Sequence, residues 1–398
     1  MSRQLILQTL LQTLRKFPPR RTGTTVTKLL VLVVLLVILN FVSAQTYVSG
    51  IISSGSTWTV SESPYIITGN TMIDDGVTLT IEPGATIKFD GNYFLRIQGT
   101  LIAEGTLSDS ILFTSNYSSP SKGDWDKIEF QGSSDDSNCV IKYAIIEYAT
   151  TGIYINDASP EVTNNTISHC SIGGISWMQG ITDLRNNTID DIGSQSGTGL
   201  YVSGNNSTTI NISDNFFSNI RGDGIRLSNN NSCSINVSDN NISHVSVHIG
   251  RYTAGIYISQ SSSDIVITNN SISGSKNTYY DGQGIYCDGS VNNLTINGNT
   301  FTGNNNGLRL NTNDKPVTIS NNTIAGSTHN GMILNAYSTN VTISNNTLTD
   351  NAQGIYWTGN SNYEPPIINF NNVINTTGYA LYVNTYKGTY TTLNAKNN

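Results

Sequence analysis

One repeated pattern constrains the fold of this 398-residue chain more than any other feature. From about Ala144 onward, Gly-apolar-x-apolar is followed by a short loop and then by an alternating apolar segment that ends in Asn-Asn-x-apolar. The second Asn of nine successive copies is Asn165, Asn187, Asn215, Asn240, Asn270, Asn299, Asn322, Asn346 and Asn372. The mean period is about 26 residues, which indicates a stack of equivalent units.

Each unit offers two or three short strands with one apolar face each. Asn, Ser, Thr and Gly are abundant and form helices poorly, so a βαβ crossover or a leucine-rich horseshoe is excluded. A β-propeller blade needs four strands in about 40 residues, which the period disfavours. Strands without helices can bury one face by coiling, each turn pairing with the next about 4.8 Å away. We therefore predict an all-β fold, a single-stranded right-handed parallel β-helix of about 14 turns.

The bends of such a coil explain the two most regular polar positions. Asn residues aligned at a bend can pass amide hydrogen bonds from turn to turn, and Asn tolerates the left-handed backbone conformation that bends require. We therefore predict an Asn ladder along the coil. The Gly before the next strand is expected to serve a tight corner.

Residues 1–44 differ from the rest of the chain. They contain six of the 20 Lys and Arg residues and no Asp or Glu. An apolar run from Leu29 to Val42 is followed by Ser43-Ala44, the small-residue pattern of a signal-peptide cleavage site. The run is shorter than the ~20 residues of a spanning helix. We predict a signal peptide, with an uncleaved signal anchor as the alternative, and a secreted or cell-surface protein.

The remainder shows no linker. Residues 45–143 are expected to form an N-terminal cap and divergent turns, residues 144–384 the regular Asn-rich turns, and residues 385–398 a polar tail. Beyond residue 44, 14 basic residues stand against all 27 acidic ones, a formal net charge of about −13. This charge argues against nucleic acid as a partner, and against membrane binding beyond the N-terminal signal.

The four cysteines, Cys139, Cys170, Cys233 and Cys287, have no CxxC or zinc-finger spacing. Cys287 occupies a position where neighbouring repeats have Ile or Leu, which favours a buried thiol. A disulfide between Cys139 and Cys170 is allowed in an exported chain, but the spacing does not indicate one.

The N-terminal segments Val77–Gly84, Gly99–Thr106, Ile111–Ser115 and Gly123–Trp125 resemble the opening of bacterial and archaeal right-handed parallel β-helix surface proteins. The Asn-Asn-Thr-Ile turns resemble the pectate-lyase-like repeat superfamily, which includes periplasmic copper-binding members. The resemblance covers nearly all of residues 46–383. It implies the fold, whereas the activity stays open because this fold hosts lyases, hydrolases, epimerases, adhesins and scaffolds.

In Gly-apolar-x-apolar the two apolar residues point inward and x points outward. The outward residues are Tyr154, Ser176, Tyr201, Arg226, Tyr257, Tyr286, Arg309, Ile333, Tyr356 and Tyr382. Tyr rings stack on sugars and Arg pairs with carboxylates, so Tyr154, Tyr201, Arg226, Tyr257, Tyr286, Arg309 and Tyr356 are candidate ligand-binding residues. The alternative is that Tyr is here only a favourable strand residue whose hydroxyl reaches water.

Catalysis needs clustered acids or a base, and the best cluster contains Arg221, Asp223, Arg226 and Asp281. Solvated charges at the corners of the coil explain the same residues more simply. No three-Asp calcium site is legible, so we expect no cofactor and no metal, although calcium is chemically allowed. His244 and His248 share a face in an expected strand, but no third metal ligand is evident.

Three hypotheses follow. The first is an exported scaffold or surface protein that binds a polysaccharide or other extended glycan through the outward Tyr and Arg residues. The second is a carbohydrate-active enzyme, either a polysaccharide lyase or a glycosidase. The third is a subunit that associates end to end into filaments, because the ends of a β-helix expose unpaired strands.

Overall fold

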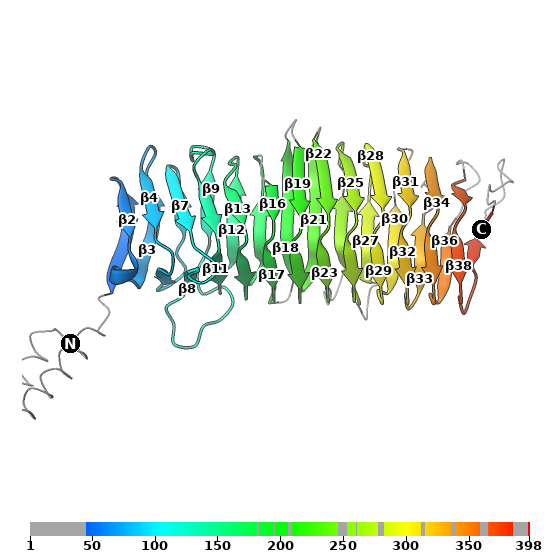
Figure 1. The fold of residues 1–398 in the computed structure, drawn as a ribbon, viewed down its shortest axis with the longest axis horizontal. Coiled ribbons are helices and arrows are strands. Elements are labelled where there is room, and N and C mark those ends of the chain that lie inside the picture. The colour runs from blue at the N-terminus through cyan, green and yellow to red at the C-terminus, as the bar shows by residue number, and fades with distance from the viewer. Residues whose placement is uncertain are drawn as a thin grey trace, which may run out of the picture. The chain divides into compact units, whose positions relative to one another are not determined.

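The computed structural model describes residues 45–398 except 181–182, 195, 206–208, 232, 246–252, 260, 278–281, 312–314, 336–339, 359–364 and 385–396, and except the side chains of 205 and 229–231. Residues Gln45–Asn398 form one compact unit. Figure 1 shows its strands stacked side by side from β2 to β38. The described residues contain one short 3-10 helix, η1 (Val60–Glu62), and otherwise only strands and loops. The predicted all-β fold is confirmed.

The strands of the described residues form a 26-stranded sheet, sheet A, and a 13-stranded sheet, sheet B, with parallel pairing throughout. A typical turn contributes one strand to sheet B, then a short strand and a longer strand to sheet A. Sheet B contains β2 (Ser56–Trp58), β4 (Thr78–Ile81), β7 (Thr100–Glu104), β10 (Val140–Lys142), β13 (Glu161–Thr163), β16 (Asp183–Arg185), β19 (Thr209–Ser213), β22 (Ser234–Ser238), β25 (Asp264–Thr268), β28 (Asn293–Asn297), β31 (Val317–Ser320), β34 (Val341–Ser344) and β37 (Ile367–Asn369). Thirteen strands in this sheet agree closely with the predicted number of turns.

The strands of sheet A run along two sides of the coil, which we call the short-strand face and the long-strand face. β1 (Thr46–Ile52) and β3 (Tyr65–Ile73) extend along both. The short-strand face contains β5 (Thr86–Phe89), β8 (Ile111–Ser115), β11 (Ala144–Glu147), β14 (Thr166–Ser168), β17 (Thr188–Asp190), β20 (Phe216–Ser218), β23 (Asn241–Ser243), β26 (Ser271–Ser273), β29 (Thr300–Thr302), β32 (Thr323–Ala325), β35 (Thr347–Thr349) and β38 (Asn372–Ile374). The long-strand face contains β6 (Leu95–Ile97), β9 (Ile128–Gln131), β12 (Thr151–Asn156), β15 (Gly173–Trp177), β18 (Gly197–Asn205), β21 (Gly222–Asn231), β24 (Thr253–Ser259), β27 (Gly282–Asp288), β30 (Asn306–Asn311), β33 (Asn330–Leu334), β36 (Gln353–Trp357) and β39 (Leu381–Val383).

An Asn ladder runs along the bend between sheet B and the short strands, as predicted. At each step the amide side chain donates to the side-chain oxygen of the next Asn, as from Asn240 Nδ2 to Asn270 Oδ1 at 2.9 Å. The residue before each ladder Asn adopts the left-handed conformation, with φ near 57° at Asp239 and Asn269. The ladder residues are Asn165, Asn187, Asn215, Asn240, Asn270, Asn299, Asn322, Asn346, Asn371 and Asn398.

The assignment of Asn372 to this ladder is wrong by one residue. Asn371 accepts from Asn346 at 2.9 Å, whereas Asn372 is exposed at the start of β38. The preceding Phe370 takes the left-handed conformation usually taken by Asn, Asp or Gly at this bend. In this turn the ladder residue is therefore the first Asn of the pair and not the second. The spacing to Asn346 could not reveal which of the two Asn side chains lies inside the coil.

The core is a continuous column of apolar side chains inside the coil, mostly Ile, Leu and Val. Aromatic residues fill it near the N-terminal end, where Phe89 and Trp125 stack with ring centroids 4.0 Å apart. All four cysteines are free and buried, so Cys139 and Cys170 form no disulfide. Cys287 lies in register with Ile258 and Leu310, which confirms the expected apolar position.

The predicted signal peptide or anchor, residues 1–44, lies outside the described residues, as does most of the polar tail, residues 385–396. In the part of the chain that is described, no helix has the length and apolar character needed to cross a membrane.

Candidate functional site

The outward residues of the long-strand face form one aligned column, as the repeat predicted. Strand register pairs Tyr154 with Ser176, and Ser176 with Tyr201. The column continues through Arg226, Tyr257, Tyr286, Arg309, Ile333, Tyr356 and Tyr382. Successive side chains are therefore separated by one strand spacing of about 4.8 Å. We call Tyr154, Tyr201, Arg226, Tyr257, Tyr286, Arg309 and Tyr356 the Tyr/Arg face.

Arg226 is fixed by two neighbours at the middle of the Tyr/Arg face. Its Nη1 donates to Asp223 Oδ2 at 2.8 Å, and Asp223 is completely buried. The other carboxylate oxygen of Asp223 accepts a hydrogen bond from the Ala254 backbone N–H at 3.1 Å. The Arg226 guanidinium carbon lies 4.1 Å from the Tyr257 ring centroid, within the range of a cation–π contact. This arrangement fixes the position of the guanidinium on the long-strand face, while the Asp223 carboxylate balances its charge.

Tyr286 packs within the face and does not present its ring to solvent. Its side chain is only 4% exposed, and its ring meets that of Tyr257 edge-on with centroids 5.3 Å apart. The Tyr286 hydroxyl accepts from Asn311 Nδ2 at 2.8 Å, and the Tyr257 hydroxyl donates to Asp288 Oδ2 at 3.2 Å. Burial, with the Asp288 carboxylate as the next cause, raises the pKa of both tyrosines. Both therefore remain neutral phenols at ordinary pH.

The other tyrosines of the Tyr/Arg face are more open than Tyr286. Tyr154, Tyr201 and Tyr356 are each partly exposed. Ser176 lies between Tyr154 and Tyr201, so these two rings are two strand spacings apart, about 9.6 Å, with a small side chain between them. Tyr356 stacks on Tyr382 with centroids 5.0 Å apart and an interplanar angle of 7°.

The candidate catalytic residues do not assemble into one acid–base group in the part of the chain that is described. Arg221 is exposed at the bend before β21 and donates to the Ser194 carbonyl at 2.7 Å. Only Asp223 and Arg226 are brought together, and both oxygens of Asp223 accept hydrogen bonds. Asp281 lies outside the described residues.

The histidine pair also gives no metal site there. His244 occupies a left-handed bend position with φ 51°, and His248 lies outside the described residues. Among residues whose placement is described, no three His, Cys, Asp or Glu side chains come together as metal ligands would. Burial raises the pKa of Cys139 to about 11 and that of Cys170 to about 12, so both thiols are poor ligands and nucleophiles at neutral pH.

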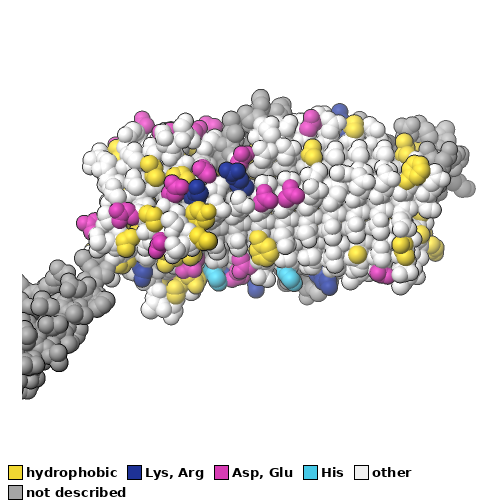
Figure 2. Space-filling model, in the orientation of Figure 1, with side chains coloured by type: hydrophobic (Ala, Val, Ile, Leu, Met, Phe, Trp, Pro, Cys, Tyr) yellow, Lys and Arg dark blue, Asp and Glu magenta, His cyan; other side chains and the backbone are white. Residues whose placement is uncertain are grey.

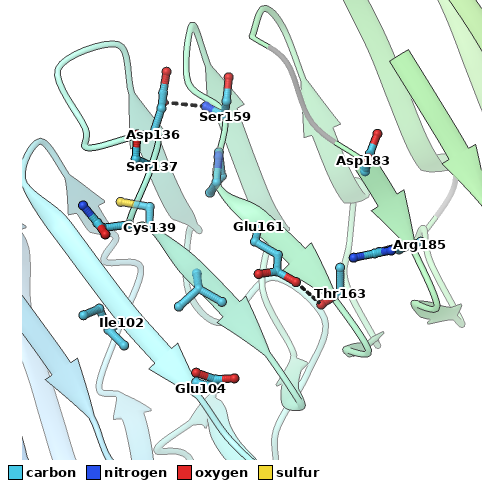
Figure 3. Close-up of a pocket in the computed structure, with 13 residues that line it drawn as sticks. Ile102, Glu104, Asp136, Ser137, Cys139, Ser159, Glu161, Thr163, Asp183 and Arg185 are labelled. Atoms are coloured by element: carbon cyan, nitrogen blue, oxygen red, sulfur yellow. Dashed lines mark hydrogen bonds between the residues drawn. The ribbon is translucent and has the colours of Figure 1, made fainter. Parts of the chain in front are cut away.

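Sequence reasoning missed a groove on sheet B. A cavity of about 570 Å³ lies over β7, β10, β13 and β16 and is open to solvent. Figure 3 shows its lining side chains, which are Ile102, Glu104, Asp136, Ser137, Asn138, Cys139, Val140, Ser159, Pro160, Glu161, Thr163, Asp183 and Arg185. The sequence feature that could have revealed the groove is the set of charged residues at these outward strand positions. The same positions hold mainly Asn, Ser or Thr in later turns.

The family comparisons agree with this architecture. The model described as "right handed beta helix region" matches residues 117–272, 184–316 and 250–396, and the "pectate-lyase like beta helix domain" matches residues 50–135. This chain belongs to the right-handed β-helix family, which confirms the predicted handedness and pectate-lyase-like resemblance. The copper-binding branch of that resemblance gains no support.

A solved phage protein shows the same fold at low sequence identity. The pre-mature gene product 12 of bacteriophage phi29 is 14% identical with a TM-score of 0.51, covering 80% of this chain and 52% of the phage chain. This chain thus spans about half of that protein. An alginate lyase from Paenibacillus (14% identity, TM-score 0.34, 76% and 91% covered) and the catalytic domain of a GH87 α-1,3-glucanase (13%, 0.30, 86% and 63%) are also similar. No curated protein matches the sequence.

Proposed function

We propose that this chain is an exported, non-catalytic β-helix protein that binds an extended polysaccharide along the Tyr/Arg face. The observation that carries the proposal is the column itself, in which aromatic and guanidinium groups lie in strand register along the coil axis. A polysaccharide is a linear polymer whose repeated units can meet such a column repeatedly. Export rests on the basic and apolar residues 1–44.

The chemistry of the face supports a carbohydrate ligand. Tyr154 and Tyr201 are partly exposed, and a tyrosine ring can stack on the apolar side of a sugar ring. The Lys127 Nζ lies 5.2 Å from the Tyr154 ring centroid and adds a cation beside it. Arg226 is held by Asp223 and Tyr257 before any ligand arrives, so little side-chain entropy is lost on binding. Polar neighbours such as Asp288 and Asn311 lie beside the column and suit sugar hydroxyls.

We favour binding over catalysis because the best acid candidate is already engaged. A general acid or base must reach the proton that it transfers, whereas Asp223 is buried and accepts from Arg226 and Ala254. The enzyme alternative predicts product release from a uronate polymer by the unmodified protein, abolished by Asp223→Asn. That result would replace the present proposal.

The test compares glycan binding by three proteins on a glycan array, with titration of any hit. Tyr154→Ala/Tyr201→Ala is expected to weaken binding about fivefold to 100-fold, since each aromatic contact contributes about 0.5–1.5 kcal/mol. Tyr117→Ala removes an exposed tyrosine that is not part of the Tyr/Arg face, two residues after the end of β8, and should leave binding unchanged. Equal affinity of the double variant and the unmodified protein would reject the Tyr/Arg face as the binding surface.

A further inference from the structure

The groove on sheet B differs from the rest of that sheet in its charge. Beyond β16, the two outward columns that continue through the groove contain only Asn, Ser, Thr and Val in β19, β22, β25, β28, β31 and β34. Asp264, the first residue of β25, lies in a third outward column outside these two. At the groove the same columns contain Glu104, Lys142, Glu161, Asp183 and Arg185. Figure 2 shows charged side chains gathered over the N-terminal turns and a nearly uncharged surface beyond them. The departure from the repeat therefore coincides with the cavity.

The floor and rim of the groove have different chemistry. Ile102 and Val140, which pair in register, supply a half-buried apolar floor. Figure 3 shows Glu104, Asp136, Glu161 and Asp183 around this floor. An apolar floor with a few polar groups at its edge is typical of a binding site, and about 570 Å³ lies within the usual range for small ligands and peptide segments.

The charge of the groove determines whether it favours a positively or a negatively charged ligand. Four carboxylates line it, and one of them, Glu104, is paired with Lys142 at 3.2 Å. The remaining three carboxylates stand against one lining cation, Arg185. Glu161 and Asp183 stand at neighbouring positions on β13 and β16, where like charges one strand spacing apart repel each other. A ligand cation between them would relieve that repulsion. The groove therefore favours a positive group joined to an apolar body.

From this geometry we propose that the sheet B groove binds a short lysine- or arginine-bearing peptide segment of a partner protein. The aliphatic part of the basic side chain lies on Ile102 and Val140, and its charged end lies between Glu161 and Asp183. The site is on a different sheet from the Tyr/Arg face, so the two surfaces can be occupied independently.

The probe is a Leu-Lys-Leu tripeptide with both termini blocked, titrated into the purified protein at low salt and followed by calorimetry. Glu161→Gln/Asp183→Asn removes two charges while keeping hydrogen-bonding groups for Thr163 and Asn211, the present partners. Asp214→Asn/Asp239→Asn is the matched control, because it removes two charges from exposed bend positions that hold Asn in other turns. Both variants change the net charge equally.

We expect saturable binding that weakens about fivefold or more in the groove variant, that stays unchanged in the control, and that falls as salt is added. Acetylation of the peptide lysine should abolish it. The proposal is overturned if the unmodified protein does not bind the peptide, or if both variants lose affinity equally. Binding of a glucosamine oligomer in place of the peptide would also overturn it.

Discussion

Asn270→Ala tests whether the Asn ladder stabilises the coil or merely accompanies it. The Asn270 side chain accepts from the Asn240 backbone N–H at 3.0 Å and donates to the Val237 carbonyl at 2.9 Å. It also donates to Asn299 Oδ1 at 3.0 Å. Alanine would leave the buried Asn240 N–H without this acceptor and the Val237 carbonyl without this donor.

Each buried polar group that loses its partner costs about 1–3 kcal/mol, so the expected loss in free energy of unfolding is about 3 kcal/mol. Because each turn of a solenoid contacts mainly its neighbours, the damage should centre on the turns before and after Asn270. Urea unfolding followed by circular dichroism measures the total, and hydrogen exchange of the Asn240 amide locates it.

Asn241→Ala is the matched control, since Asn241 is the exposed first residue of β23, directly after a ladder Asn. Its change should remain within about 0.5 kcal/mol. If Asn270→Ala and Asn241→Ala destabilise the protein equally, the ladder hydrogen bonds contribute nothing beyond the stacking of strands, and the reasoning fails.

Three further predictions concern other parts of the coil. Burial raises the pKa values of the Cys139 and Cys170 thiols to about 11 and 12, above the unfolded value of about 8.5. The contribution of these two neutral thiols to the free energy of unfolding is therefore complete below pH ~8.5 and is lost as the pH rises through 11–12. Cys139→Ala/Cys170→Ala should accordingly show a smaller alkaline loss of stability in urea titrations at pH 8 and 10.5, and an identical loss would contradict this. Gly284→Ala should lower the free energy of unfolding by about 1–3 kcal/mol, because the new Cβ would collide with the Gly307 carbonyl and lie 2.6 Å from Phe301 Cδ1. Thermal unfolding measures this loss. Gly55→Ala is the control, because a Cβ at Gly55 has space. Asp223→Ala should cost about 1–3 kcal/mol by leaving the Ala254 N–H and Arg226 without their acceptor, and an unchanged melting temperature would show that this ion pair is dispensable.

Side-chain direction in the regular turns could be predicted from sequence, and the reason is the two-residue alternation of strands. Ile225 and Leu227 point inward and Arg226 outward, as expected from Gly-apolar-x-apolar. The same reasoning failed to distinguish Asn371 from Asn372, because two adjacent Asn residues carry no alternation of their own.

The role of the repeated Gly also needed the structure. Glycine in a repeat usually indicates a backbone conformation that other residues avoid. Gly284, however, does not have a positive φ. Glycine is required at this position because the backbone of the next turn approaches too closely for a Cβ atom. Tyr286 is a similar case. Its outward position followed from the pattern, but its burial depends on Tyr257, Asp288 and Asn311, which come from two neighbouring turns and its own.

The sequence by itself determined the coil, because a 26-residue repeat without helices leaves apolar strands only one way to be covered. It also determined the order of side chains along the long-strand face, since equal spacing places equivalent residues in register. Tertiary structure alone decided which of those side chains remain accessible and where sheet B is hollowed. Exposure depends on contacts between turns, and the carboxylates around Ile102 and Val140 come from segments as far apart in sequence as Glu104 and Asp183.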